Sequence, residues 1–505
     1  MVSMKNSLKT EFGDFQTPAE LAEAVMKTVR MKINNFRSLL EPTCGTGSFI
    51  TAALKIFPDL DTLIGVEINS EYAKRAVSDI HDPYRKVRII NRDFFSVEIP
   101  SILRELEEPI LVAGNPPWVT NSELSAIGSG NLPEKTNFRN ISGLDALTGK
   151  SNFDISEWML TQILYWLRDR KAVIAVLCKT AVARNVLKYA WENNIPITNC
   201  EIRIIDARKH FNASVDSCFL YIETAKEIAS LDCRIYDGFK EGKHRGTWGY
   251  RDGKLVSDVD SYDAYKHLQG KEHYIWRSGI KHDCSKIMEL VFQDEKFSNG
   301  LGEIVDIEES FLFPMLKSSD LSNGSVNTIK RWMIVPQSSV NDDTALIESV
   351  APKTWGYLCS HSGLLNKRGS SVYKKRPQFS IFGIGEYTFS KWKVAISGFY
   401  KNPVFRVIGQ YEDKPVVLDD TCYFIPCTSR EESEFIAGLL NSDISIAFLS
   451  TFVFWDSKRP ITKEVLGRLD IRKLSVQLKL EDTLMRLSRP LNREAGRPEQ
   501  QVLFK

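Results

Sequence analysis

The first half of the chain alternates short apolar runs with helical patterns, and no other feature of the sequence constrains the fold as strongly. This alternation extends from Arg37 to about Ala225 and is typical of a parallel sheet covered by helices on both faces. It predicts an α/β fold with a mostly parallel sheet of seven strands. The strands are expected at 38–41, 63–68, 87–93, 110–114, 172–178, 201–205 and 217–223, and the main helices at 18–30, 71–80, 154–168 and 181–193.

The alternation stops after Ala225, where a connection to a second domain is expected. Gly, Asp, Lys and aromatic residues dominate the stretch that follows, so residues 226–275 are interpreted as a connector. Residues 276–505 mix short strands with helices and are numerous enough for a domain of their own. We therefore expect a first domain at 1–275, which includes the connector, and a C-terminal α+β domain at 276–505.

The apolar stretches and the cysteines indicate a cytoplasmic protein. The first 15 residues contain no continuous apolar core, so they do not form a secretory signal. The most apolar later stretch, 435–455, is interrupted by polar residues at 441–443, which argues against a membrane span. Nine scattered cysteines are typical of reduced thiols inside a cell. Cys422 and Cys427 have no second pair that would complete four ligands, so no metal site is expected.

A glycine turn follows the first predicted strand, in the segment Glu-Pro-Thr-Cys-Gly-Thr-Gly at 41–47. Glycine allows the backbone to approach a ligand closely because it has no Cβ atom. A dinucleotide-binding turn requires a third small residue at the position of Ile50, so binding of a pyrophosphate is disfavoured. The turn at Gly45 and Gly47 therefore predicts a different small-molecule ligand.

Acidic residues end the next two predicted strands. Glu67 ends the second strand, and a carboxylate in that position can accept hydrogen bonds from both hydroxyls of a ribose. Asp93 ends the third strand beside Phe94, and this pair offers an acceptor for an adenine amino group next to an aromatic wall. Each acid alone suggests no more than a solvated strand end, but the succession predicts a nucleoside site at the carboxyl edge of the sheet.

The fourth predicted strand leads directly into Asn115-Pro116-Pro117-Trp118. The exocyclic nitrogen of adenine is a poor nucleophile because its lone pair is delocalised into the ring. The side-chain oxygen of Asn115 and the carbonyl of Pro116 can accept its two hydrogens and direct the lone pair at an electrophile. The two prolines stiffen this backbone, while Trp118 offers a face on which an extruded base can stack. Phe211, shortly before the last strand, is a second candidate for stacking or a simple core residue.

These motifs together resemble the gamma class of amino methyltransferases that act on DNA in bacterial restriction-modification systems. The resemblance covers about residues 12–222 and includes Phe12 to Pro18, which is similar to the element that closes over the cofactor in that family. It implies a Rossmann-like sheet, S-adenosylmethionine as the cofactor, and methylation of adenine N6 in double-stranded DNA. It departs from the family at Trp118, where Tyr or Phe is common. The residues that it implies for the cofactor site are Thr17, Glu41, Cys44, Gly45, Gly47, Glu67, Ile68, Asp93, Phe94 and Asn115.

The second half is interpreted as a domain that recognises the target sequence in DNA. A block from Asn366 to Arg406 contains many Lys, Arg and aromatic residues, although the net charge of the whole chain is only +2. Cations neutralise phosphates, and other polar side chains read the base edges. The candidate phosphate-binding residues are Lys374, Lys375, Arg376, Lys391, Lys458 and Arg459. A solvated charged surface is the alternative for any one of them.

Other functions remain open on the sequence alone. The same chemistry applies to cytosine N4, to an RNA base or to the side-chain amide of a protein glutamine, but a peptide substrate would not need some 230 further residues. A fused nuclease would need an additional metal site, which the sequence does not suggest, so a cognate restriction endonuclease is expected to be a separate protein. A recognition subunit that only binds DNA would not need the cofactor motif. We expect the protein to act as a monomer and not to associate with a membrane.

Overall fold

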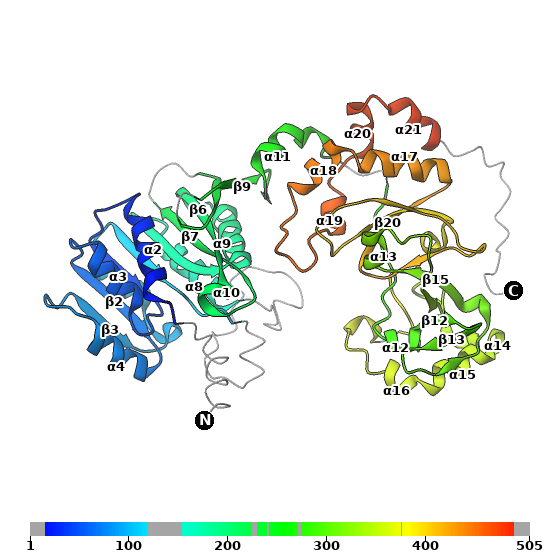
Figure 1. Cartoon of the computed structure of the whole chain (residues 1–505), viewed down its shortest axis with the longest axis horizontal. Helices are drawn as coiled ribbons and strands as arrows, with labels where there is room; N and C mark the ends of the chain where they lie inside the picture. The colour runs from blue at the N-terminus through cyan, green and yellow to red at the C-terminus, as the bar shows by residue number, and fades with distance from the viewer. Residues whose placement is uncertain are drawn as a thin grey trace. The chain divides into compact units, whose positions relative to one another are not determined.

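The computed structural model describes residues 16–119, 154–224, 230–239, 242–270, 274–374 and 376–488. The chain forms two compact units, Met1–Val259 and Asp260–Lys505 (Figure 1). The boundary therefore falls earlier than the expected one at 275. Each unit has its own sheets and its own hydrophobic core.

A sheet of ten strands forms the centre of the first unit, in the order β10-β9-β8-β6-β7-β5-β4-β1-β2-β3. β1 to β5 pair in parallel, whereas β7 runs antiparallel between β5 and β6. The predicted α/β class with a mostly parallel central sheet is confirmed. The strands are β1 (Ser38–Glu41), β2 (Thr62–Glu67), β3 (Val87–Asn91), β4 (Ile110–Gly114), β5 (Ala172–Lys179), β6 (Ile197–Asp206), β7 (Asp216–Thr224), β8 (Asp232–Asp237), β9 (His244–Arg251) and β10 (Lys254–Val256).

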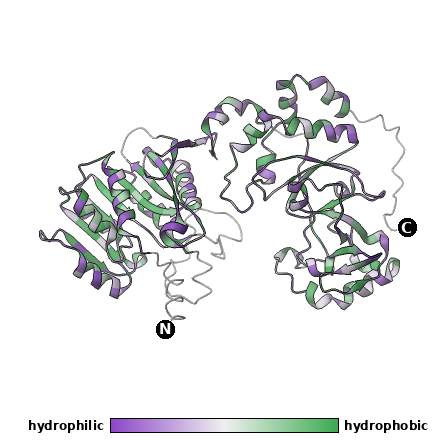
Figure 2. Cartoon of the chain, viewed as in Figure 1, coloured by the Kyte–Doolittle hydropathy of each residue, from purple (hydrophilic) through white to green (hydrophobic). Residues whose placement is uncertain are grey.

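Helices cover both faces of this sheet because its strands carry apolar side chains on both sides. In β1 Leu39 belongs to one core cluster and Leu40 to the other. The cluster on one face includes residues of α2, α3 and α4, and the cluster on the other includes residues of α5, α8 and α9. Figure 2 shows the apolar strands between helices that carry polar residues on their outer sides. The helices are α2 (Ala19–Arg30), α3 (Ser48–Ile56), α4 (Ser70–Asp79), α5 (Ile99–Glu105), α8 (Ile155–Trp166), α9 (Thr180–Glu192) and α10 (Ala207–Phe211).

The predicted connector differs from the structure. Its residues form β8, β9 and β10, and they extend the sheet beyond the seven predicted strands. β8 pairs in parallel with β6, and β9 returns antiparallel beside it. In β8 only Cys233 and Ile235 are buried, and β9 has a single buried residue, Gly249. Strands at the end of a sheet bury little surface, so their sequences lack the apolar runs by which the inner strands were predicted.

The second unit contains two smaller sheets with helices beside them, which agrees with the α+β class. One sheet has the order β11-β20-β17-β18 and the other the order β14-β13-β12-β16-β15-β19. The strands are β11 (Arg277–Ser278), β12 (Glu289–Gln293), β13 (Lys296–Asn299), β14 (Ile304–Val305), β15 (Leu312–Leu316), β16 (Arg331–Ile334), β17 (Trp392–Ser397), β18 (Arg406–Ile408), β19 (Val417–Leu418) and β20 (Cys422–Cys427). The helices, after α11 (Val259–Tyr265) at the unit boundary, are α12 (Ser285–Met288), α13 (Ser318–Asn323), α14 (Ile347–Val350), α15 (Pro352–Ser360), α16 (Ser362–Leu365), α17 (Arg430–Leu440), α18 (Asp443–Ser450), α19 (Lys463–Leu466), α20 (Ile471–Gln477) and α21 (Glu481–Ser488).

Candidate functional site

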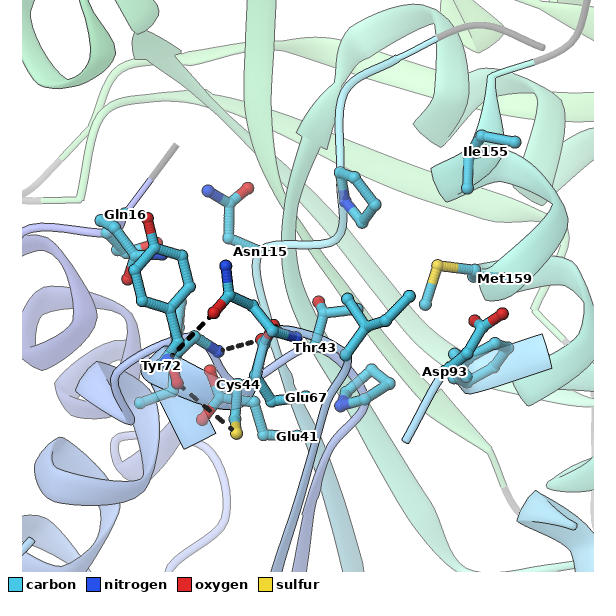
Figure 3. A pocket seen from close by; sticks show the side chains of 18 of the residues that line it. Gln16, Glu41, Thr43, Cys44, Glu67, Tyr72, Asp93, Asn115, Ile155 and Met159 are labelled. Atoms are coloured by element: carbon cyan, nitrogen blue, oxygen red, sulfur yellow. Dashed lines mark hydrogen bonds between the residues drawn. The ribbon is translucent and has the colours of Figure 1, made fainter. Parts of the chain in front are cut away.

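A pocket opens at the carboxyl edge of β1, β2, β3 and β4, and it encloses about 950 Å³ together with its open mouth. Every predicted cofactor residue except Gly47 lines it. Pro117 of the Asn-Pro-Pro-Trp corner lines it as well. Figure 3 shows Glu41, Cys44, Glu67 and Asn115 around this space. The structure therefore brings together side chains that lie on four different strand ends.

The glycine turn requires its glycines for two different reasons. Gly45 and Gly47 have φ angles of +53° and +86°, in the left-handed region that glycine tolerates best. A Cβ atom at Gly45 would lie 2.7 Å from the side-chain oxygen of Gln16, at the rim of the pocket. A Cβ atom at Gly47 would instead lie 2.6 Å from Cδ1 of Ile80, behind the turn. Gly47 therefore shapes the turn from outside the pocket.

The carboxylate of Glu67 is fixed by two backbone groups. The Gly45 N–H donates to Oε2 at 2.8 Å, and the Asn69 N–H donates to Oε1 at 2.7 Å. The residue is only 7% exposed, yet it lines the pocket. A carboxylate can accept about four hydrogen bonds in all, so a glutamate in this position suits two neighbouring hydroxyl groups. This geometry fits a ribose.

Glu41 is the most deeply buried acid of the pocket, at 2% exposure. The Ile50 N–H donates to its Oε2 at 3.3 Å. Burial raises the pKa of Glu41 well above its usual range, and the nearby charge of Glu67 raises it further. A positively charged ligand would compensate both effects. The pair of carboxyl groups thus fits a cationic group in the pocket.

The raised pKa of Glu41 predicts how the stability of the unliganded protein depends on pH. Between the usual pKa of glutamate and its raised value, the folded protein holds a proton that the unfolded chain has lost, so stability falls as pH rises. The variant Glu41→Gln has no ionisable group at this position, so it should not lose stability in this way as the pH rises. We expect the variant to melt a few degrees above the wild type at pH 8, given that 1 kcal/mol shifts Tm by about 2–4 °C in a domain of this size. The difference should shrink as the pH approaches 5.

Calorimetric melting of both proteins across this pH range measures the effect. The exposed residue Glu71 provides the control, because Glu71→Gln should leave the pH dependence of Tm unchanged. A variant that is less stable than the wild type by the same amount at every pH would show that Glu41 is ionised in the empty pocket.

The third strand end supplies a polar and an aromatic wall. Asp93 begins the short turn that follows β3, and its Oδ1 accepts the Phe95 N–H at 3.0 Å. Phe94 is buried and contacts Trp158 edge-on, with ring centroids 6.3 Å apart. The Asp93 carboxylate and the Phe94 ring both line the pocket, an arrangement that suits a purine with an exocyclic amino group.

The Asn-Pro-Pro-Trp corner has two sides. Asn115, Pro117 and Val119 line the pocket, whereas Pro116 and Trp118 are buried and do not. Trp118 is 5% exposed and packs edge-on against Phe211, with ring centroids 5.1 Å apart and planes at 72°. The two predicted stacking residues are therefore neighbours, but rings already in contact leave no space for a base between them.

Several lining residues were missed by the sequence analysis. Ile155 and Met159 come from the first turns of α8, and their spacing predicted only a buried helix face. Tyr72 and Asn69 come from the start of α4, where Asn69 caps the helix through its side chain. In the sequence, Asn69 could be recognised only as a helix N-cap, and this pattern marks the start of a helix but does not indicate a ligand. The other missed residues are Gln16, Pro42, Thr43, Ser48, Phe49, Arg92, Phe95 and Val119.

The predicted phosphate-binding residues of the second unit differ in their availability. Lys374, Lys391 and Lys458 are exposed. Arg376 is also exposed but donates to Asn341 Oδ1 at 2.7 Å. Arg459 is partly buried and pairs with Asp420, whose Oδ2 lies 3.6 Å away. Lys375 lies outside the described residues.

Another cation of the same basic block is not at the surface. Lys393 on β17 is 1% exposed, and burial lowers its pKa to about 7. Its ammonium donates to the backbone oxygen of Ser390 and lies 5.9 Å from the ring centroid of Phe424. The density of basic residues in the sequence therefore overstates the positive charge that this region presents to solvent.

Within the described part of the chain, no group of three or more His, Cys, Asp or Glu side chains is placed to hold a metal ion. None of the helices in these ranges has the length and apolar character needed to cross a bilayer.

Known proteins resemble this chain to different extents. It is 43% identical over 478 residues to the type II methyltransferase M.NspV of Nostoc sp. (strain ATCC 29411 / PCC 7524), and the alignment covers 94% of this chain and 99% of that protein. It is 32% identical over 114 residues to the type II methyltransferase M.CvrRI of Paramecium bursaria Chlorella virus XZ-6E, which covers 22% of this chain and 26% of that protein. The solved structure of the type IIL restriction-modification enzyme MmeI in complex with DNA is 12% identical, with a TM-score of 0.49 over 97% of this chain and 76% of that one. No protein-family model matches the chain.

Proposed function

Because this chain belongs to the type II methyltransferases of restriction-modification systems, we propose that it transfers a methyl group from S-adenosylmethionine to N6 of adenine in double-stranded DNA. One observation carries the proposal. Asn115 opens into the same pocket as Glu67 and Asp93, so a nucleoside-binding wall and an amide acceptor face one space. A methyl donor and a target amino group bound in this pocket would therefore lie close enough for the methyl group to be transferred.

The pocket residues divide the cofactor among them in this proposal. Glu67 binds the ribose hydroxyls, and Asp93 with Phe94 binds the adenine. Glu41 faces the positively charged part of the molecule, in agreement with its burial and its neighbour Glu67. Thr17, Cys44, Gly45 and Ile68 complete the walls. When bound, S-adenosylmethionine supplies an electrophilic methyl group on a sulfonium centre.

Asn115 and Pro116 act on the amino group of the target. The Asn115 amide oxygen and the Pro116 carbonyl accept its two hydrogens, which draws the nitrogen toward tetrahedral geometry and orients its lone pair. No side chain of tuned pKa is needed as a base, because the amine becomes acidic only as the new bond forms. The base must first leave the duplex, and stacking on Trp118 or Phe211 offsets part of the cost of its extrusion.

The second unit recognises the target sequence in this proposal. Lys374, Lys391 and Lys458 are the exposed cations available for phosphates, joined by Arg376. Arg459 is a weaker candidate because Asp420 already neutralises it. The protein acts as a cytoplasmic monomer, and a cognate endonuclease is a separate protein.

Product analysis tests the chemistry directly. Purified protein is incubated with labelled S-adenosylmethionine and unmethylated genomic DNA, and the DNA is digested to nucleosides. We expect the label in N6-methyl-2′-deoxyadenosine only, because the Asn-Pro-Pro corner is suited to an amino group in the plane of a purine. Label in N4-methylcytosine would contradict the base assignment. Label in RNA, or in the protein as methylglutamine, would contradict the substrate class.

A further inference from the structure

The first unit carries three exposed cations at the carboxyl edge of its sheet, the same edge at which the Asn-Pro-Pro-Trp corner follows β4. β6 and β8 are parallel to each other and to β5, so their carboxyl ends lie on the edge of the sheet that holds the pocket. α10 follows β6 and contains Arg208 and Lys209. Lys243 lies at the end of β8, because its carbonyl accepts the Asp237 N–H at 3.2 Å. All three cationic side chains are exposed.

Aromatic packing connects these cations to the corner. Phe239 follows β8 and packs on Phe219 of β7, with ring centroids 5.6 Å apart. Phe239, Phe211 and Trp118 all belong to or pack against one core cluster, together with Phe219. Phe211 is the last residue of α10, two positions after Lys209. The cations are thus attached to the same rigid assembly as the two aromatic residues proposed for base stacking.

These cations lack the acidic partners that basic residues have at the opposite edge of the sheet. There, Arg37 pairs with Asp61 at 2.6 Å, and Arg170 pairs with Glu108. At the carboxyl edge, Asp237 and Asp206 have other partners. Asp237 pairs with Arg245 at 2.6 Å, the Asp206 carboxylate caps α10 through backbone N–H groups, and Asp216 forms no ion pair among the described residues.

The side chains of Arg208, Lys209 and Lys243 themselves form no ion pair within the described parts of the chain. The Arg208 guanidinium donates to the hydroxyl of Ser214 at 3.3 Å. Exposed cations without acidic partners remain available to an external anion.

We propose that Arg208, Lys209 and Lys243 form a phosphate-binding edge on the first unit, which grips the DNA backbone next to the extruded nucleotide. The inference rests on the proposed function and adds a DNA surface outside the recognition domain. A nucleotide that enters the corner must bring its own flanking phosphates to this edge. Cations at this edge bind the phosphates of the distorted DNA backbone, whatever the base sequence of the DNA.

Binding to duplex DNA at several salt concentrations tests the edge. The variant Arg208→Gln/Lys209→Gln/Lys243→Gln is compared with the control Lys171→Gln/Lys188→Gln, whose residues are an exposed lysine before β5 and one on α9. Fluorescence anisotropy with a mixed-sequence double-stranded oligonucleotide gives the affinity. The slope of log K against log salt is negative, and each lost phosphate contact reduces its magnitude by about 0.9.

We expect the triple variant to show a slope that is shallower by about 2 to 3 and binding weakened by about tenfold or more at low salt. The control should keep the wild-type slope. Calorimetric affinity for S-adenosylmethionine and the melting temperature should stay unchanged, which shows that the pocket and the fold are intact. The single variant Lys243→Gln should make the slope shallower by about 1, and it replaces the triple variant in the test if that protein is unstable.

The outcomes separate the two proposals. A triple variant that binds duplex DNA with the slope of the control would overturn the phosphate-binding edge and leave the proposed function intact. A wild-type protein that binds no duplex DNA at any salt concentration would overturn the proposed function, and the edge with it.

Discussion

Replacement Asn115→Ala should abolish methyl transfer while the cofactor still binds. Asn115 lies at the end of β4 and lines the pocket, but the cofactor is proposed to be held chiefly by Glu67, Asp93 and Glu41. Without the amide oxygen, one amino hydrogen of the target has no acceptor and the lone pair is not oriented. We expect the turnover rate to fall by about 100- to 1,000-fold or more, the range for removal of one positioned hydrogen-bonding group from a transition state.

Single-turnover transfer of labelled methyl to DNA measures the rate, and calorimetry measures the affinity for S-adenosylmethionine. Asn193→Ala is the matched control, since Asn193 is an exposed residue at the end of α9 outside the pocket. Turnover within tenfold of the wild type would exclude Asn115 from the chemistry. A comparable loss of cofactor affinity would instead make Asn115 a binding residue.

Replacement Glu67→Ala should produce the largest loss of cofactor affinity. The carboxylate offers acceptors for two hydroxyls and also fixes the N–H groups of Gly45 and Asn69. Hydrogen bonds to a charged group contribute about 1.5–3 kcal/mol each. The loss of two therefore predicts a dissociation constant at least about 100-fold higher, because 1.4 kcal/mol corresponds to tenfold.

Two further variants distinguish ligand binding from damage to the turn. Glu67→Gln keeps the size and one acceptor, so its affinity for S-adenosylmethionine should fall between those of the wild type and Glu67→Ala. Glu71→Ala changes an exposed acid of α4 that pairs with Lys74, and it should bind normally. If Glu67→Ala binds the cofactor as tightly as Glu71→Ala, the ribose is held elsewhere.

The inner strands of the first unit could be predicted because strands that are buried on both faces appear in the sequence as continuous apolar runs. All residues of β1 and β4 are buried, and their positions match the predicted ranges. The functional side chains follow from the same rule, since parallel strands deliver their carboxyl ends to one edge. Glu67, Asp93 and Asn115 could therefore be predicted to lie near one another from the sequence, whereas Glu41 was implied by the family resemblance.

The remainder depends on contacts between distant residues. β8 and β9 are held by pairing with β6 and with each other, and their own residues are mostly half-buried or exposed. Met159 of α8 lines the pocket. This helix lies next to the site because of tertiary packing, which its own sequence does not reveal. Lys393 looked like a surface cation in a basic block, yet its neighbours bury it completely. Local sequence patterns carry no information on such neighbours.

The contact between Trp118 and Phe211 has a consequence for which nucleobase the corner admits. An arriving base exchanges an existing aromatic pair, worth about 0.5–1.5 kcal/mol, for its own stacking, worth about 1–3 kcal/mol. Entry is then governed by the difference between these two energies, which is small. If the proposed base flipping takes place at this corner, a purine, with its wider ring system, gains more from the exchange than a pyrimidine, and the resting contact would then disfavour entry of cytosine and thymine.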